Sequence, residues 1–153
     1  MSQQELDVFV DSSEIGWGAT ILGEQVGGVF SSSLIGTSST LRELSGLLAC
    51  TEHPTVRPLV TNKVVRWNMD SKPAVANLTN GGGPIPSLCT VVKKLWIQWD
   101  FLHVSSSFRW LPRETLEMQR VDMMSKVLSF WLKPEIQRSL SVEFGREFFF
   151  SFV

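Results

Sequence analysis

Several residue types on which specialised sites depend are scarce in this sequence. Its 153 residues include no tyrosine, two histidines and two cysteines. Neither Cys50 nor Cys89 stands in a Cys-x-x-Cys or a Cys/His spacing, which argues against a disulfide framework and against a structural zinc site. So few cysteines are typical of a reduced, intracellular protein.

Long apolar segments are also absent from the sequence. No run approaches the roughly 20 apolar residues that a membrane-spanning helix requires, and the N-terminal residues do not follow the pattern of a secretion signal. Hydrophobic residues make up 43% of the chain, which is enough for the core of a globular domain. Core packing is predicted for most of the tryptophans, namely Trp17, Trp67, Trp96, Trp99 and Trp110. We therefore expect a protein of the cytoplasm or nucleus that is not secreted and has no membrane partner.

The sequence has no large excess of charge of either sign. There are 14 lysines and arginines and 15 aspartates and glutamates, which gives a net charge of −1. The charge is uneven, because residues 1–56 sum to −6 and residues 57–153 to +5. This asymmetry fits an acidic site beside a basic surface, but it also fits a folded chain in which the two regions mix. The net charge therefore argues only against tight binding to nucleic acid by this chain alone.

Five short runs of β-branched and aromatic residues predict five strands. Three of them, at residues 6–11, 16–22 and 25–30, are separated by turn residues and predict an antiparallel meander. The other two, at residues 63–69 and 104–111, each follow a helical segment, as parallel strands joined by crossover helices do. We therefore expect an α/β fold with a mixed five-stranded sheet, three strands antiparallel and then two parallel, and with helices on both faces.

Helical periodicity and capping residues predict the helices. Thr40-Leu-Arg-Glu43 matches a capping box at the start of the first helix, and Pro54 and Pro58 end that helix. A second helix is predicted to begin at Asp70 or Ser71. Three further helices are predicted at residues 87–102, 119–128 and 134–144.

The chain shows no internal repeat and no linker that would divide it. We expect one α/β domain at residues 1–128 and a C-terminal extension at residues 129–153. The extension contains the short helix at residues 134–144. Its last residues, 148–153, read Phe-Phe-Phe-Ser-Phe-Val and fit either the start of an interrupted segment or an exposed, aggregation-prone tail.

Four acidic residues stand at the ends of the predicted elements, and each has an ordinary structural explanation. Asp11 fits a turn after the first strand, and Glu43 fits the reciprocal acid of the capping box. Asp70 fits a helix N-cap, and Asp122 fits the first turn of a helix, where the helix dipole favours an acid. Taken singly, none of the four requires a functional role.

Taken together, the four acids predict a metal site. Asp11 and Asp70 end two strands that the topology places side by side and parallel, and ligands bind at the carboxyl ends of such strands. Glu43 and Asp122 begin two helices that can pack at the same edge. Four carboxylates in one place repel one another unless cations neutralise them, and hard divalent cations such as Mg²⁺ prefer oxygen ligands. A pair of ions ~3.5–4 Å apart would activate a water molecule and stabilise the leaving oxygen of a phosphodiester.

The order of the motifs around these acids resembles ribonuclease H. The sequence reads Asp-Ser-x-x-x-Gly-Trp-Gly-Ala from Asp11, Leu-Arg-Glu-Leu around Glu43, Met-Asp-Ser around Asp70 and Val-Asp-x-x-Ser-Lys around Asp122. With Trp-Leu-Pro-Arg-Glu between the last two motifs, the set is most similar to the ribonuclease H domain of DIRS-like, tyrosine-recombinase retroelements. The resemblance covers residues 6–128 and implies the mixed five-stranded sheet of that family.

The resemblance also implies an activity, a cofactor and partners. Following the family's order of acids, Asp11, Glu43, Asp70 and Asp122 would hold two Mg²⁺ ions, which Mn²⁺ can replace. They would hydrolyse the RNA strand of RNA–DNA hybrids by a two-metal-ion mechanism. An adjacent reverse transcriptase domain of the same polyprotein would supply binding, and the oligomeric state is left open. Contacts with the nucleic acid are expected from Ser12, Ser71, Lys72 and Arg113.

The sequence departs from the family pattern in two places, and other functions remain open. Residues 112–121 contain no histidine, although many ribonucleases H have one before the last acid. The helix at residues 87–102 has only Lys93 and Lys94, so the basic protrusion of some cellular ribonucleases H is absent. One alternative is a non-catalytic docking or connection module that keeps this fold, and another is a small enzyme of unrelated chemistry. A transposase, an integrase and a proofreading exonuclease each require a different order of acids.

Overall fold

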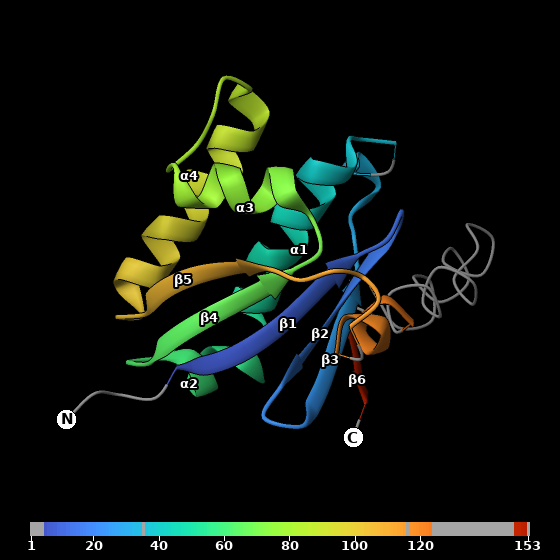
Figure 1. Ribbon diagram of the computed structural model, residues 1–153, viewed down its shortest axis with the longest axis vertical. Helices are drawn as coiled ribbons and strands as arrows, with labels where there is room; N and C mark the ends of the chain where they lie inside the picture. The colour runs from blue at the N-terminus through green and yellow to red at the C-terminus, as the bar shows by residue number, and fades with distance from the viewer. Residues whose placement is uncertain (1–4, 35, 116, 124–148, 153) are drawn as a thin grey trace.

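One mixed sheet forms the centre of the molecule (Figure 1). The computed structural model describes residues 5–34, 36–115, 117–123 and 149–152. In these ranges six strands lie in the order β5-β4-β1-β2-β3-β6. The strands are β1 (Leu6–Ser12), β2 (Gly16–Ile21), β3 (Glu24–Val29), β4 (Val64–Met69), β5 (Ser105–Trp110) and β6 (Phe149–Phe152).

The first three strands form the predicted antiparallel meander. Val10 of β1 pairs with Ala19 of β2, and β2 pairs with β3 in turn. Leu22 and Gly23 join β2 to β3 with φ angles of 50° and 78°. Positive φ at both central residues is what a type I′ hairpin turn requires, and its twist matches that of the two strands.

The fourth and fifth strands lie parallel to β1 on its other side. Val8 of β1 pairs with Trp67 of β4, and Trp67 pairs with Phe108 of β5. The predicted mixed sheet, three strands antiparallel and then two parallel, is therefore confirmed. This pairing brings the carboxyl ends of β1 and β4 together, and these are the ends at which Asp11 and Asp70 stand.

The sixth strand corrects the expectation for the last residues of the chain. The sequence predicts an interrupted segment or an exposed tail there. The exposed tail is wrong, because β6 pairs antiparallel with β3, with Phe150 opposite Gly27, and the interrupted segment stays a prediction. Without β6, the outer side of β3 would leave backbone N–H and C=O groups unpaired, and an aromatic run has a high propensity to form a strand. The predicted helix at residues 134–144 lies outside the described residues.

Helices cover the sheet. They are α1 (Ser39–Glu52), α2 (Val56–Val60), α3 (Lys72–Thr79) and α4 (Pro86–Phe101), with a 3₁₀ turn at Ser32–Leu34 and a helical segment at residues 117–123. The helices α1, α3 and α4 contact one another on one side of the sheet, and the segment 117–123, drawn in orange, lies on the side that faces the viewer (Figure 1). Among the residues described, no helix is both long enough and apolar enough to cross a membrane.

Pro58 lies inside a helix, which corrects part of the prediction. The helix α1 ends before Pro54, as expected, but Pro58 does not mark a break, because it is the third residue of α2. The N–H groups in the first turn of a helix have no partner within that helix, so a proline there loses no hydrogen bond.

Aromatic residues fill the space between the sheet and α4. Trp67 of β4 and Trp99 of α4 are both fully buried, and their rings stack with 5.6 Å between the centroids. Nε1 of Trp99 donates a hydrogen bond to Oγ1 of Thr51 in α1 at 3.3 Å. These contacts hold α1 and α4 against β4.

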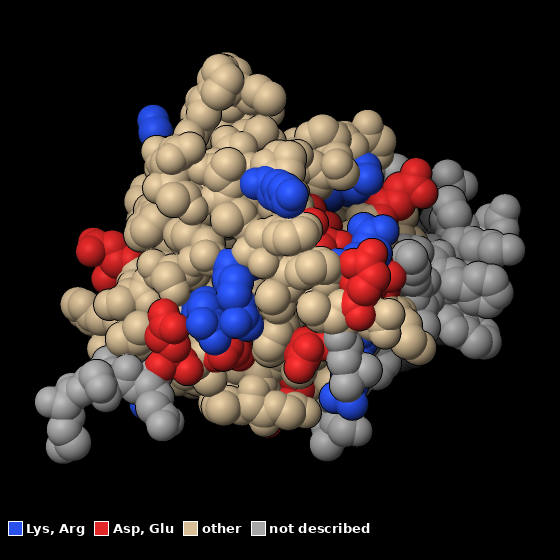
Figure 2. Space-filling model, viewed as in Figure 1, with Lys and Arg blue, Asp and Glu red and all other residues tan. Residues whose placement is uncertain are grey.

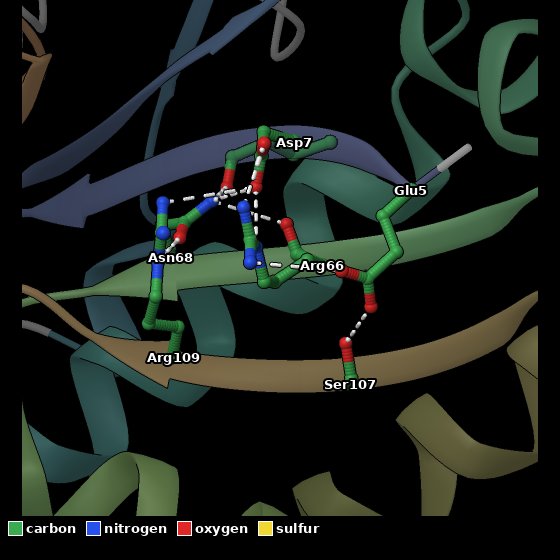
Figure 3. Close-up of polar contacts among 7 residues, drawn as sticks. Glu5, Asp7, Arg66, Asn68, Ser107 and Arg109 are labelled. Carbon is green, nitrogen blue, oxygen red and sulfur yellow. Dashed lines mark hydrogen bonds and ion pairs between the residues drawn. The ribbon is translucent and has the colours of Figure 1, made fainter.

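A polar network joins β1, β4 and β5 across the surface of the sheet (Figure 3). Nε and Nη2 of Arg66 donate to the two carboxylate oxygens of Asp7 at 2.7 and 3.0 Å, and this contact holds the pKa of Asp7 below its ordinary value. Nδ2 of the fully buried Asn68 donates to Oδ1 of Asp7 and to the carbonyl oxygen of Val8, both at 3.1 Å. Its Oδ1 accepts from Nε of Arg109 at 2.6 Å. The network links the first residues of β1 to β4 and β5.

Candidate active site

Three of the four predicted acids come together at the carboxyl ends of β1 and β4. Asp11 is in β1, Glu43 is in α1, and Asp70 directly follows β4. One carboxylate oxygen of each lies within 4.8 Å of the other two. Asp11 is fully buried and Glu43 is 6% exposed, as is the side chain of Asp70. Figure 2 shows acidic side chains in a hollow on this face, with basic side chains around it.

Glu43 is positioned by β1 and not by the cap of its own helix. The N-cap of α1 is Ser38, whose Oγ accepts a hydrogen bond from the N–H of Leu41 at 3.2 Å. The predicted capping box of Thr40 and Glu43 is therefore wrong. Oε1 of Glu43 instead accepts a hydrogen bond from the N–H of Ser12 at 3.2 Å. This bond fixes the carboxylate beside the end of β1.

Gly46 allows α1 to lie close to the sheet. A Cβ atom on Gly46 would clash with Oγ of Ser12 and would come within 3.1 Å of Cβ of Trp17. The hydroxyl of Ser12 is buried at this contact, so the approach depends on the absence of a side chain at position 46. Glu43 lies one turn earlier on the same face of α1 and is brought to the end of β1 by this approach.

Burial and mutual repulsion disfavour the ionised forms of these acids. Burial, and then the charges of Glu43 and Asp70, raise the pKa of Asp11 well above its ordinary value of 3.8. Burial, and then the charge of Asp70, likewise raise the pKa of Glu43 above its ordinary value of 4.5, although the hydrogen bond from Ser12 opposes this. Within the described residues, no N–H or hydroxyl group donates a hydrogen bond to either carboxylate oxygen of Asp11 or to Oε2 of Glu43.

The set of oxygen atoms fits a hard divalent cation. Buried carboxylates without donors are unfavourable unless a positive charge neutralises them, and Mg²⁺ and related ions take carboxylate oxygens as ligands. Asp11 and Glu43, which both have buried oxygens without donors, belong to the same group as Asp70. No second group of three or more acidic, histidine or cysteine side chains with this spacing occurs among the residues that the structure describes.

Asp122, the fourth predicted acid, lies beside this group. It is half-buried in the helical segment 117–123, and its side chain contributes to raising the pKa of Asp11. It is not one of the three acids whose oxygens lie within 4.8 Å of one another. Its role as a metal ligand therefore stays a prediction.

Comparison with solved structures identifies the fold. The RNase H1 of the halophilic archaeon Halobacterium salinarum matches with a TM-score of 0.66 at 14% identity, over 84% of this chain and 100% of the other. The chain has the ribonuclease H fold. LC11-RNase H1, isolated from compost, matches with a TM-score of 0.55 at 15% identity, over 90% of this chain and 99% of its own.

A further match is LC11-RNase H1 in complex with an RNA/DNA hybrid, with a TM-score of 0.51 at 15% identity over 78% of this chain and 92% of the other. No protein-family model and no curated protein matches the sequence. At such low identities the similarity establishes the ribonuclease H fold, and an activity has to be argued from the site.

The end of β5 and the loop after it hold Asp70 in this ribonuclease H fold. Nε of Arg113 donates to Oδ2 of Asp70 at 2.9 Å, and Nε1 of Trp110 donates to the carbonyl oxygen of Asp70 at 3.1 Å. Nζ of Lys72 lies over the Trp110 ring, 4.4 Å from its centroid. The sequence predicts a core position for Trp110, whereas the residue is 39% exposed at the edge of the sheet. Trp110 begins the Trp-Leu-Pro-Arg-Glu motif. Its contact with Asp70 is not predictable from that motif, because the sequence does not reveal that β5 is an outer strand.

The residues predicted to contact nucleic acid have different surroundings. The hydroxyl of Ser12 is buried beside Gly46. Ser71 is the N-cap of α3, and its Oγ accepts a hydrogen bond from a backbone N–H of the first turn at 3.2 Å. Lys72 and Arg113 are exposed and lie next to Asp70 in sequence or in space. Contacts of all four with nucleic acid stay predictions.

We expect the binding of a divalent metal to release protons and to weaken as the pH falls. Because the pKa values of Asp11 and Glu43 are raised, these carboxyl groups hold protons at a pH where ordinary carboxyl groups are ionised. A cation must displace those protons. Calorimetric titration with Mn²⁺ at neutral pH, in two buffers of different ionisation enthalpy, measures the release. A binding enthalpy that is the same in both buffers would contradict this prediction.

Proposed function

We propose that this protein is a metal-dependent endonuclease that hydrolyses the RNA strand of RNA–DNA hybrids. The observation that carries the proposal is the convergence of Asp11, Glu43 and Asp70 at the carboxyl ends of two parallel strands of a ribonuclease H fold. A module with a purely structural role would gain nothing from buried carboxylates that repel one another, whereas a metal-dependent enzyme needs them. This argument favours the enzyme over a non-catalytic docking or connection module.

Each acid has a part in holding the ions. Asp11, Glu43, Asp70 and Asp122 would bind two Mg²⁺ ions, which Mn²⁺ can replace. When bound, the ions would activate a water molecule and stabilise the departing oxygen of the scissile phosphodiester. Among the described residues, no N–H or hydroxyl group donates a hydrogen bond to either carboxylate oxygen of Asp11, so both oxygens are available as ligands. Glu43 is held in place by the N–H of Ser12, so its ligand oxygens are oriented before an ion arrives.

The substrate is proposed from the surroundings of the site. LC11-RNase H1, which shares the fold, is known in complex with an RNA/DNA hybrid. Lys72 and Arg113 are exposed beside the acids, and Ser71 lies between Asp70 and Lys72 in the sequence. Their positions support the proposal that these residues contact phosphates. Because the net charge is −1, we propose that affinity for the hybrid comes partly from another domain.

The order of motifs supports a specific origin for this chain and a specific identity for the other domain. We propose that the chain derives from a DIRS-like retroelement and works in the cytoplasm or nucleus beside the reverse transcriptase domain of the same polyprotein. The motifs that support this origin lie at Asp11, Glu43, Asp70, Asp122 and residues 110–114.

Cleavage of a labelled hybrid by the purified full chain tests the proposal. We expect cleavage of the RNA strand with Mg²⁺ or Mn²⁺ and none in EDTA, and we expect Asp70→Asn to lower the rate at least about 10-fold, since Asp70 is proposed to hold metal directly. Asp100→Asn is the matched control, because it removes the same charge from an exposed position on α4 and should leave the rate unchanged.

Two outcomes would count against the proposal. A folded protein that never cleaves the hybrid, even at high concentration with Mn²⁺, would exclude the endonuclease for this chain. Equal cleavage by Asp70→Asn and wild type would exclude the assignment of the site. Single-stranded RNA and double-stranded DNA serve as comparison substrates, and the proposal expects neither to be cut as fast as the hybrid.

A further inference from the structure

One arginine lies directly against the carboxylate site. Nε of Arg113 donates to Oδ2 of Asp70 at 2.9 Å, and the arginine side chain is 61% exposed while that of Asp70 is 6% exposed. A buried carboxylate is therefore paired with a cation at the surface of the hollow. In the residues that the structure describes, no other lysine or arginine forms an ion pair with Asp11, Glu43 or Asp70.

The loop that carries Arg113 is fixed to the end of β4. The N–H of Leu111 donates to the carbonyl oxygen of Met69 at 2.9 Å, which continues the pairing of β4 with β5 by one residue. Trp110 donates to the carbonyl oxygen of Asp70. Arg113 is therefore held close to Asp70 by the backbone, and its contact does not depend on a long side chain finding its partner unaided.

The charge of Arg113 acts on the whole group of acids. Its hydrogen bond to Asp70, and then the charges of Asp70, Asp122 and Asp11, raise the pKa of Arg113. In return, Arg113 opposes the rise in the pKa of Glu43. One monovalent cation cannot neutralise this group, and the oxygens of Asp11 and Oε2 of Glu43 still lack donors in the described part of the chain.

We propose that Arg113 is the resident counter-ion of this site: it pairs with Asp70 while no metal is bound, and it competes with a divalent cation for the negative charge of the site. The part that concerns metal rests on the proposed function, whereas the pairing itself does not. Removing the positive charge leaves Asp70 buried without a partner, which destabilises the metal-free protein. The same change makes the site more negative, which strengthens its attraction for a divalent cation.

Three variants of the full chain separate these effects. Arg113→Ala removes the charge, Arg113→Lys keeps it, and Arg57→Ala is the matched control, because Arg57 is an exposed arginine of α2 that lies over the Phe101 ring. In EDTA, we expect Arg113→Ala to melt at a lower temperature than Arg57→Ala. The melting temperature of Arg113→Lys should lie between those of Arg113→Ala and wild type. In calorimetric titration, we expect Arg113→Ala to bind Mn²⁺ about 3- to 10-fold more tightly than wild type, because an exposed charge is partly screened.

A double-mutant cycle with Asp70→Asn tests the pairing without any metal. If Arg113 acts on Asp70, Arg113→Ala should change the unfolding equilibrium about 3- to 10-fold less in the Asp70→Asn background than in wild type. If the effects of Arg113→Ala and Asp70→Asn on the unfolding equilibrium are additive, Arg113 does not act on Asp70, and its proposed role as a counter-ion is refuted. If Arg113→Ala binds Mn²⁺ as tightly as wild type or more weakly, Arg113 does not compete with the metal ion and instead helps the site to bind it. A wild type that binds no divalent cation would overturn the proposed function and the competition together, while the cycle still decides the pairing.

Discussion

Asp11→Asn is expected to abolish most of the nuclease activity and, at the same time, to make the metal-free protein more stable. Activity should fall at least about 100-fold, because the variant loses a proposed direct ligand, and even changes to the residues that orient ligands cost 10- to 100-fold. Stability should rise by about 1–3 kcal/mol in EDTA at neutral pH, since a buried carboxyl group that is crowded by two other acids is replaced by a neutral amide of the same shape.

The pH dependence follows from the raised pKa of Asp11. Folding favours its protonated form, so its contribution to stability is present below the ordinary pKa of 3.8 and is lost as the pH rises toward the higher value in the folded protein. Chemical denaturation in EDTA between acid and neutral pH should therefore show wild type losing stability relative to Asp11→Asn. Parallel curves for the two proteins would contradict this expectation.

Asp7→Asn is the natural control for that experiment. Asp7 lies four residues earlier in the same strand, but its hydrogen bond from Arg66 lowers its pKa. Its contribution to stability is therefore present above the ordinary pKa of 3.8 and is lost as the pH falls through the lower value in the folded protein. Asp7→Asn should thus slightly destabilise the protein at neutral pH, the opposite sign to Asp11→Asn. The two variants remove the same charge from one strand, so opposite signs would show that surroundings and not net charge decide the effect.

Gly46→Val is the second change for which we expect a large effect. The new side chain would overlap Oγ of Ser12 and crowd Trp17, so α1 must move away from the sheet. Overpacking of this kind lowers the free energy of unfolding by about 1–3 kcal/mol. Cleavage should fall as well, because Glu43 is on the same helix and its hydrogen bond to the N–H of Ser12 depends on the close approach.

Two further variants separate crowding from helix propensity. Ser45→Val places the same β-branched residue at the adjacent, half-buried position of α1 and should cost only the small difference in helix propensity. Ser12→Ala in the Gly46→Val background removes the clashing oxygen and should restore part of the stability and of the cleavage rate. If Gly46→Val were as stable as Ser45→Val in denaturant titrations, the proposed close contact would be refuted.

The site was predictable where it depends on strand ends and less so where it depends on helix packing. Asp11 and Asp70 could be assigned because each follows a short apolar run, and parallel strands bring their carboxyl ends together. Glu43 was ambiguous, because Thr40-Leu-Arg-Glu43 satisfies a local capping pattern. The structure resolves the ambiguity. Ser38 caps the helix, and the carboxylate of Glu43 accepts a hydrogen bond from the N–H of Ser12 in β1.

Other features depend on contacts between distant parts of the chain, and the sequence does not show these. The same apolar signature describes Trp67, which is fully buried in a central strand, and Trp110, which is 39% exposed in an outer one. Position in the sheet, and not residue type, makes the difference. The role of Gly46 is hidden for a similar reason, because only the packed structure shows that Ser12 and Trp17 lie against it.

The pairing of β6 with β3 has a consequence for how the chain folds. Gly27 and Phe150 pair although they are about 120 residues apart in the sequence, and closing so long a loop loses much chain entropy before the contact is formed. We therefore expect β6 to join the sheet late, after the meander of β1, β2 and β3 has formed. Until then β3 is an open edge, and intermolecular pairing there competes with correct folding. Refolding at low protein concentration should favour the native sheet.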